Sequence, residues 1–158
     1  MKQAFGFIIL IFFTSCQYFE AKKTTSEAIL NEELKTFNWD EVDVYPSFSI
    51  CDSLVTKATK RACFEHTLSA HILNFLQEEV IVVTQDVNDT ITLNFKISEK
   101  GAITLNKTDI DSVTLQEIPN LKVLINNSLQ TLPKVYAAIK RDQYVKTTFT
   151  LPIIIGVE

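Results

Sequence analysis

The stretch "TITLNFKISEKGAITLNKTDI", residues 90–110, decides the fold. From residue 90 to 97 apolar and polar side chains alternate, the pattern of a strand with one buried face. Glu99-Lys100-Gly101 follows, and its glycine can take the positive φ that a tight turn needs. Residues 102–110 return as the partner strand. The stretch therefore predicts an antiparallel β-hairpin with one face turned to a core.

Helical patterns lie on both sides of this hairpin. Residues 56–78 repeat apolar side chains at helical spacing, and a second helix is expected from Pro119 to its stop at Pro133. The stripes are Phe64, Leu68, Ile72, Phe75 and Leu76 in the first, and Leu121, Leu124, Ile125, Leu129 and Leu132 in the second. "VIVV", residues 80–83, predicts a short strand, and residues 144–155 predict the last one. Pro152 lacks an amide donor, so that strand should lie at a sheet edge or a bulge.

The predicted order is helix, helix, strand, hairpin, helix, strand, which is an α+β arrangement of a small antiparallel sheet packed by helices. An additional helix is expected to begin at Ser26. The segment 38–48 is expected to be irregular, with its aromatic side chains packed on the domain; an exposed aromatic binding strip is the alternative.

An apolar run of ten residues, 4–13, ends in "FFTSC", residues 12–16. About 20 apolar residues are needed to span a bilayer, so this run suits the apolar part of a signal peptide. The small residues before Cys16 resemble the lipobox of bacterial lipoproteins, although Phe13 stands where leucine is usual. The resemblance implies cleavage before Cys16, a lipid on its thiol and an envelope protein facing the periplasm. An ordinary secretory leader or a short membrane anchor is the alternative.

The remaining cysteines follow from that resemblance. The chain has three cysteines, and an odd count in an exported protein leaves one thiol to explain. If Cys16 carries lipid, Cys51 and Cys63 remain as a candidate disulfide in an oxidising compartment. Two reduced, buried thiols are the alternative.

The C-terminal two thirds resemble a known family. The hairpin "ITLNFKISEKGAITL" and the later "SLQTLPKVYAAIKRDQYVKTTFTLPIII" are similar to the hairpin, helix, "LP" stop and closing strand of the TonB C-terminal domain. The resemblance divides the chain into a signal peptide (1–15), a tether (16–25), an N-terminal helix with the aromatic segment (26–50) and a TonB C-terminal-like domain (51–158). Val135, Ala137, Asp142 and Tyr144 depart from the family's aromatic, proline and glycine positions.

Charge and motifs exclude several classes of function. Removing residues 1–15 changes the formal charge from −4 to −5, so the chain lacks the basic footprint of nucleic-acid binders. His66 and His71, five residues apart on a helix, are poorly placed to share a metal. We find no catalytic motif and expect neither an enzyme nor a cofactor. Lys134, Lys140 and Arg141 form one local basic cluster, either a solvated loop or a contact for an acidic partner.

The resemblance implies a function in protein binding. TonB domains bind a segment of an outer-membrane receptor by adding it to a sheet edge, and residues 144–151 are the expected edge here. Its candidate residues are Val145, Thr147, Phe149 and Leu151. The expected partners are the membrane, through lipid on Cys16, and an outer-membrane receptor or envelope complex. The alternative is a degenerate TonB-like domain in a structural accessory lipoprotein, without energy transduction.

Overall fold

The computed structural model describes residues 37–157. The leader, Cys16, the tether and the helix expected after Ser26 lie outside these residues. All described residues belong to one compact unit, which includes the aromatic segment 38–48.

The centre of the fold is a long antiparallel strand pair. β3 (Val87–Ile97) pairs along its whole length with β8 (Thr147–Val157). β4 (Ile103–Asp109) returns from the predicted turn and pairs with the other side of β3. β1 (Phe37–Asn38) adds two parallel residues at the start of β8, which gives the sheet order β1-β8-β3-β4. The α+β class is therefore confirmed.

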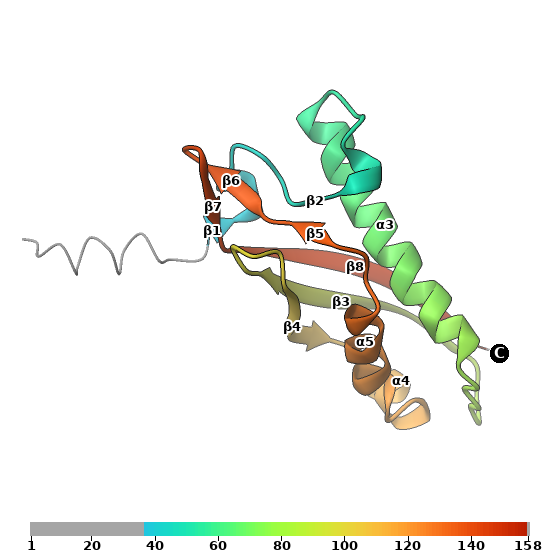
Figure 1. Ribbon diagram of the computed structural model, residues 1–158. Coiled ribbons are helices and arrows are strands. Elements are labelled where there is room, and N and C mark those ends of the chain that lie inside the picture. The colour runs from blue at the N-terminus through green and yellow to red at the C-terminus, as the bar shows by residue number, and fades with distance from the viewer. Residues whose placement is uncertain (1–36, 158) are drawn as a thin grey trace, which may run out of the picture. The chain divides into compact units, whose positions relative to one another are not determined.

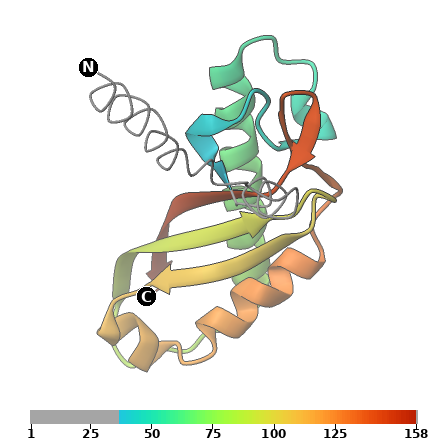
Figure 2. The ribbon, with the colours of Figure 1, turned by 90° about the vertical axis from the view of Figure 1, so that its left-hand side faces the viewer.

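The helices cover one face of this sheet (Figures 1 and 2). α3 (Lys57–Glu78) crosses it, and α5 (Leu121–Gln130) packs beside α3 and near β4. The buried side chains of the two central strands are Val87, Ile91, Leu93, Phe95 and Ile97 with Thr147, Phe149, Leu151, Ile153 and Ile155. Ring contacts join the layers: Phe48 stacks on Phe64, which meets the edge of Phe149, with centroids 5.0 and 5.6 Å apart.

Several short elements lie near the N-terminal end of α3. The 3-10 turns η1 (Trp39–Glu41) and η2 (Ser49–Cys51) flank β2 (Ser47–Phe48), which pairs with β5 (Val135–Tyr136). β6 (Ala138–Lys140) and β7 (Gln143–Val145) form a separate hairpin. Phe48 is buried and Tyr45 packs against the core, so the predicted packing of these two aromatic residues is confirmed.

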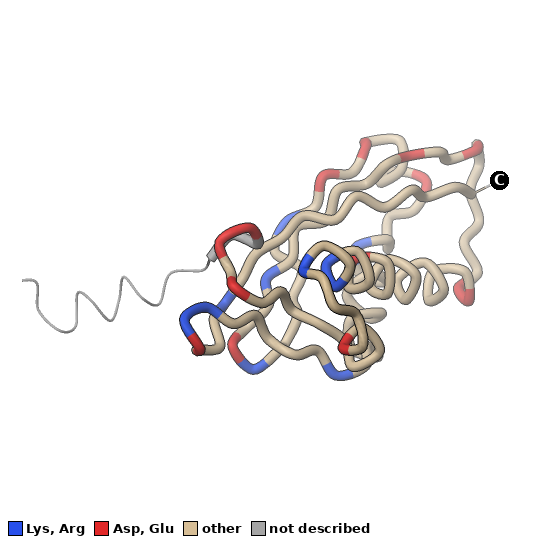
Figure 3. Tube along the Cα trace, turned by 90° about the horizontal axis from the view of Figure 1, so that it is seen from above, with Lys and Arg blue, Asp and Glu red and all other residues tan. Residues whose placement is uncertain are grey.

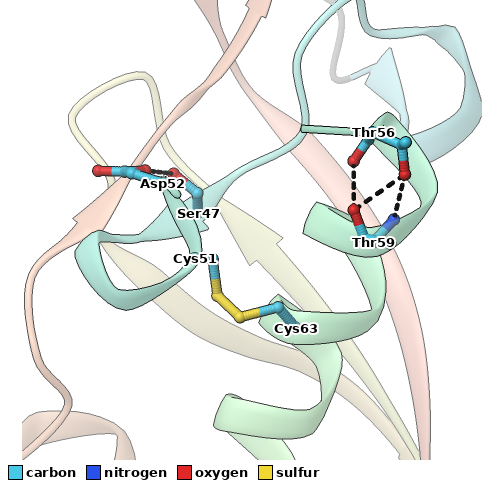
Figure 4. The surroundings of a disulfide bond; sticks show 6 residues. All are labelled: Ser47, Cys51, Asp52, Thr56, Thr59 and Cys63. Carbon is cyan, nitrogen blue, oxygen red and sulfur yellow. Dashed lines mark hydrogen bonds between the residues drawn. A yellow bond between two sulfur atoms is a disulfide. The ribbon is translucent and has the colours of Figure 1, made fainter. Parts of the chain in front are cut away.

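Cys51 and Cys63 form the predicted disulfide (Figure 4). Their Cα atoms lie 5.9 Å apart, and the bond attaches the η2 turn to the second turn of α3. The side-chain oxygen of Thr56 caps α3 by accepting the Thr59 backbone N–H at 3.1 Å. The incoming segment is thus fixed to the helix by a covalent bond just beyond a capped first turn.

Three predicted elements are wrong in detail. Residues 80–83 form no strand; Ile81 and Val83 pack against the core from an irregular segment, while Val80 and Val82 are 93% and 81% exposed. The helix expected at Pro119 begins at Leu121, after a further helix, α4 (Ser112–Glu117), that the sequence did not predict. The last strand is divided, since residues 143–145 pair with β6 before β8 begins at Thr147.

Candidate functional site

The candidate site is the outer edge of β8. β1 pairs with Thr147 and Thr148 only. From Phe149 to Val157 the strand pairs with β3 on one side, and no other described strand pairs with its second side. Among the described residues, no strand therefore uses the outward backbone N–H and C=O groups of this edge. Pro152 lies in this open part, as its missing donor predicts.

The position of Pro152 indicates which backbone groups point outward. Pro152 stands opposite Thr92, and a residue without an N–H fits only a non-hydrogen-bonded pair of an antiparallel ladder. Residues alternate along the strand, so Thr150 and Ile154 also direct their N–H and C=O groups away from β3. An added strand would find donors at these two residues and an acceptor but no donor at Pro152.

An apolar groove adjoins the end of this edge. It has a volume of about 350 Å³ and lies between the C-terminal part of α3, the segment after it and the end of β8. Leu73, Leu76 and Ile81 line it from one side, and Ile154 and Val157 from the other. Glu79 is its one charged lining residue. Such a groove can receive apolar side chains of a segment that pairs with β8.

The predicted edge residues occupy different positions from those expected. Val145 belongs to β7 and pairs with Ala138 in the separate hairpin. Thr147 is fully buried beside β1, and the side chains of Phe149 and Leu151 face the core. The accessible side chains of the edge belong to the alternate residues Thr150, Pro152 and Ile154, of which Ile154 is 68% exposed. The alternation of strand side chains predicts these exposed positions once Phe149 and Leu151 are taken as buried.

The predicted basic cluster is divided. Lys134 precedes β5 and lies over the Tyr136 ring, 5.1 Å from its centroid. Lys140 and Arg141 lie at the tip of the β6–β7 hairpin, where acidic groups meet them. Lys140 pairs with Glu41 at 3.8 Å, and the Arg141 backbone N–H donates to an Asp43 carboxylate oxygen. Acidic and basic positions are interspersed over much of the described chain (Figure 3).

Two titratable residues within 37–157, His71 and Glu117, make contacts between separate segments of the chain. His71 Nε2 lies 3.0 Å from the Ser128 carbonyl oxygen, and the described residues contain no group of three potential metal ligands. The Glu117 carboxylate accepts the Thr84 backbone N–H and hydroxyl, and these hydrogen bonds lower the pKa of Glu117. This contact joins α4 to the segment after α3. No helix within residues 37–157 has the length and apolar character of a membrane span.

The chain matches no protein-family model, no curated protein and no solved structure.

Proposed function

We propose that this chain is a lipid-anchored protein-interaction module of the bacterial envelope, facing the periplasm, and that β8 accepts an extended partner segment by strand addition. The observation that carries the proposal is the open edge of residues 149–157. Unpaired backbone groups supply affinity to an added strand, and alternate side-chain positions supply selectivity. An outer-membrane receptor or transport complex is the partner class that the TonB resemblance implies.

Three further features support this proposal. The hairpin β3–β4, the later helix α5 and the closing strand β8 beside β3 follow the order expected of a TonB C-terminal-like domain. The lipobox-like stretch ending at Cys16 would supply the membrane anchor, since two or more acyl chains bind stably where one binds weakly. The disulfide suits an oxidising compartment.

The groove beside β8 restricts which side chains a partner segment can place there. Its lining is apolar apart from Gln77, Glu79 and backbone groups, so an apolar side chain of the added segment would be buried there. A carboxylate in the same place would face Glu79 across the groove. We therefore expect a partner segment with an apolar residue, and without an acidic one, opposite Ile154.

Site-specific photocrosslinking in cells tests the edge. A photoreactive residue is placed at Thr150 or Ile154 on β8, and as matched controls at Thr90 or Thr92, whose side chains alternate with the buried ones on the neighbouring strand β3. Strand addition predicts that one partner crosslinks from the β8 positions and much less from the controls. Equal crosslinking from both strands, or none from β8, would remove the support for this edge.

A proline variant separates backbone pairing from side-chain contact. Ile154→Pro removes an outward N–H and leaves the β3–β8 hydrogen bonds in place, whereas Ile154→Thr keeps the N–H and removes apolar area. Strand addition predicts that the proline variant loses the crosslinked partner while its thermal unfolding changes little. A partner that remains bound to the proline variant at wild-type affinity contradicts the proposal.

The lipid anchor is tested separately. Mass spectrometry of the N-terminal peptide of the native protein should find residue 16 as the first residue, with acyl groups attached. The Cys16→Ser variant should no longer fractionate with membranes. An intact segment 1–15 in the native protein would contradict the anchor without affecting the edge.

A structural accessory role is the second candidate. β1 already covers the first two residues of β8, so the N-terminal region begins to occupy the same edge. Hydrogen exchange on the full chain distinguishes the candidates. Rapid exchange of the Thr150 and Ile154 amides indicates an open edge that can accept a partner, and strong protection indicates an edge already covered.

A further inference from the structure

The opposite edge of the sheet carries a second groove. β4 is the last strand of the sheet order, and within residues 37–157 no strand pairs with its outer side. A groove of about 560 Å³ lies between this strand and the C-terminal end of α5. Figure 2 shows α5 running beside β4. This groove is separate from the β8 edge, because β3 and β8 lie between them.

The hairpin register indicates which groups of β4 face the groove. The Ser98 N–H donates to the Ala102 carbonyl, so these two residues form a hydrogen-bonded pair. The next pair, Ile97 with Ile103, is then non-hydrogen-bonded, and Phe95 with Leu105 is the following one of that kind. Ile103 and Leu105 thus direct their N–H and C=O groups outward. An extended peptide beside β4 can form four backbone hydrogen bonds with them.

The side chains of the groove complement such a peptide. Ile103 and Leu105 from β4, with Leu129 and Leu132 from α5 and the residues after it, are apolar and only partly buried. Alternate side chains of an added strand would point toward α5 and cover this surface. The groove therefore combines an unpaired strand edge with apolar surface for alternate side chains, the two features that strand addition uses.

The charge of the groove selects an acidic peptide. Its lining contains two lysines and no carboxylate, although the whole chain has a formal charge of −4. Lys100 and Lys134 lie at the same end, because Gly101 and Val135, their neighbours in sequence, are in contact there. Among the described residues no carboxylate pairs with either lysine, whereas Lys140 and Lys146 pair with Glu41 and Glu99.

The turn geometry distinguishes an acidic side chain from a terminal carboxylate. A terminal carboxylate is held by free backbone amides, but the amides of this turn are already used. The Lys100 and Ala102 N–H groups donate to the Ser98 hydroxyl, and the Gly101 N–H donates to the Ser98 carbonyl. The groups left to hold an acidic side chain are the two lysine ammonium groups, of which that of Lys134 also lies over the Tyr136 ring. We infer that the β4–α5 groove binds, by strand addition, an extended internal segment of another protein that carries an acidic side chain opposite Lys100 and Lys134.

A displayed library of random linear peptides, selected on the full-chain lipoprotein in detergent, tests this inference. Enriched peptides should combine alternating apolar residues with one aspartate or glutamate. Lys100→Glu/Lys134→Glu should weaken their binding about tenfold, since each pair of exposed charges contributes modestly. Lys107→Glu/Lys122→Glu makes the same charge change on exposed residues of β4 and α5 outside the groove, and should leave binding near wild type.

Further outcomes decide the mode of binding. Alternate amides of a bound strand point toward β4 and away from it. N-methylation of the amides that point toward β4 should abolish binding, and N-methylation of the other set should leave binding unchanged. Three results would overturn the inference. The selected peptides could lack acidic enrichment, or both charge-reversed variants could lose the same amount of peptide binding. The third result is a loss of peptide binding caused by Ile154→Pro on β8. The protein could also self-associate with rising concentration, and Lys100→Glu/Lys134→Glu could abolish this self-association. That result would assign the groove to a second copy of this chain and would overturn the inference.

Discussion

Removing the disulfide should destabilise the domain without unfolding it. Cys51 and Cys63 are separated by 12 residues, and closing a loop of this size in the unfolded chain corresponds to about 3 kcal/mol on the chain-entropy model. Cys51→Ala/Cys63→Ala should lower the free energy of unfolding by that amount. A 3 kcal/mol loss lowers the Tm of a domain of this size by roughly 12 °C. The folded state should remain, because domains are typically stable by about 5–15 kcal/mol.

Local opening of the folded state without the disulfide should be confined to one end of the molecule. Without the disulfide, the Phe48–Phe64 stack still attaches residues 47–56 to α3. The hydrogen bond from the Ser47 hydroxyl to the Asp52 carboxylate still joins the two sides of the η2 turn. Hydrogen exchange should therefore accelerate over residues 47–56 through local opening, whereas amides in β3 and β8 should accelerate only as far as the global free energy of unfolding falls.

Urea unfolding, followed by circular dichroism in a Cys16→Ser background, measures the effect. The cysteine variant is compared with the oxidised and the reduced protein, and the reduced protein controls for the volume lost with two sulfur atoms. A loss below about 1 kcal/mol in both forms would refute the loop-closure reasoning. Two titratable thiols in the denatured, unreduced protein would refute the bond itself.

Three further predictions concern single residues. Thr147 is fully buried and its hydroxyl has no hydrogen-bond partner among the described residues, so Thr147→Val should stabilise by about 1 kcal/mol in urea unfolding. Thr114→Val is the matched control, because the Thr114 hydroxyl donates a hydrogen bond at 2.9 Å, and it should destabilise instead. Gly101 has φ +82°, and an added Cβ would lie 2.0 Å from a backbone oxygen, so Gly101→Ala should cost about 2–4 kcal/mol in the same assay. The pKa of Glu117 lies below its ordinary value of 4.5 because Thr84 donates to the carboxylate. The contribution of Glu117 to stability should therefore be complete above pH 4.5 and disappear as the pH falls through the lowered pKa, a trend that Glu117→Gln should lack in unfolding titrations.

The sequence predicted the elements whose pattern extends over many residues. α3 has five apolar residues at helical spacing, and β3 alternates without interruption from Ile91 to Ile97. In both, local propensity agrees with the tertiary contacts. The disulfide followed from counting cysteines once Cys16 was assigned to lipid, and the structure places the two sulfur atoms in bonding contact.

The errors occurred where tertiary contacts override a short local pattern. "VIVV", residues 80–83, has high strand propensity, but tertiary packing outweighs propensity in this segment, which pairs with no described strand. Ile81 and Val83 pack against the core from an irregular segment instead. α4 is six residues long, too short for a helical period to be visible in the sequence. The pairing of β1 with β8 joins residues about 110 positions apart, which no local signal encodes.

Three of the four candidate edge residues, Thr147, Phe149 and Leu151, lie on the strand with the unpaired side, but their side chains are buried. The sequence identified the buried face of β8, because apolar alternation is visible without knowing which side is paired. Binding by strand addition depends instead on the backbone groups that remain unpaired, and these follow from the sheet order. The β4–α5 groove depends on the same information together with the contact between Gly101 and Val135.

The two open edges differ in chemistry, and this difference bears on specificity. The groove at β8 is apolar with one glutamate, whereas the groove at β4 is apolar with two lysines. Unpaired backbone groups alone would let either edge accept the same extended segment, since main-chain hydrogen bonds carry no sequence information. An acidic residue placed opposite Glu79 is repelled, and the same residue opposite Lys100 and Lys134 is attracted. The two proposed sites therefore differ in one respect: charge disfavours the acidic segment of the β4 groove at the β8 edge, whereas a segment without an acidic residue is not excluded from β4 by charge.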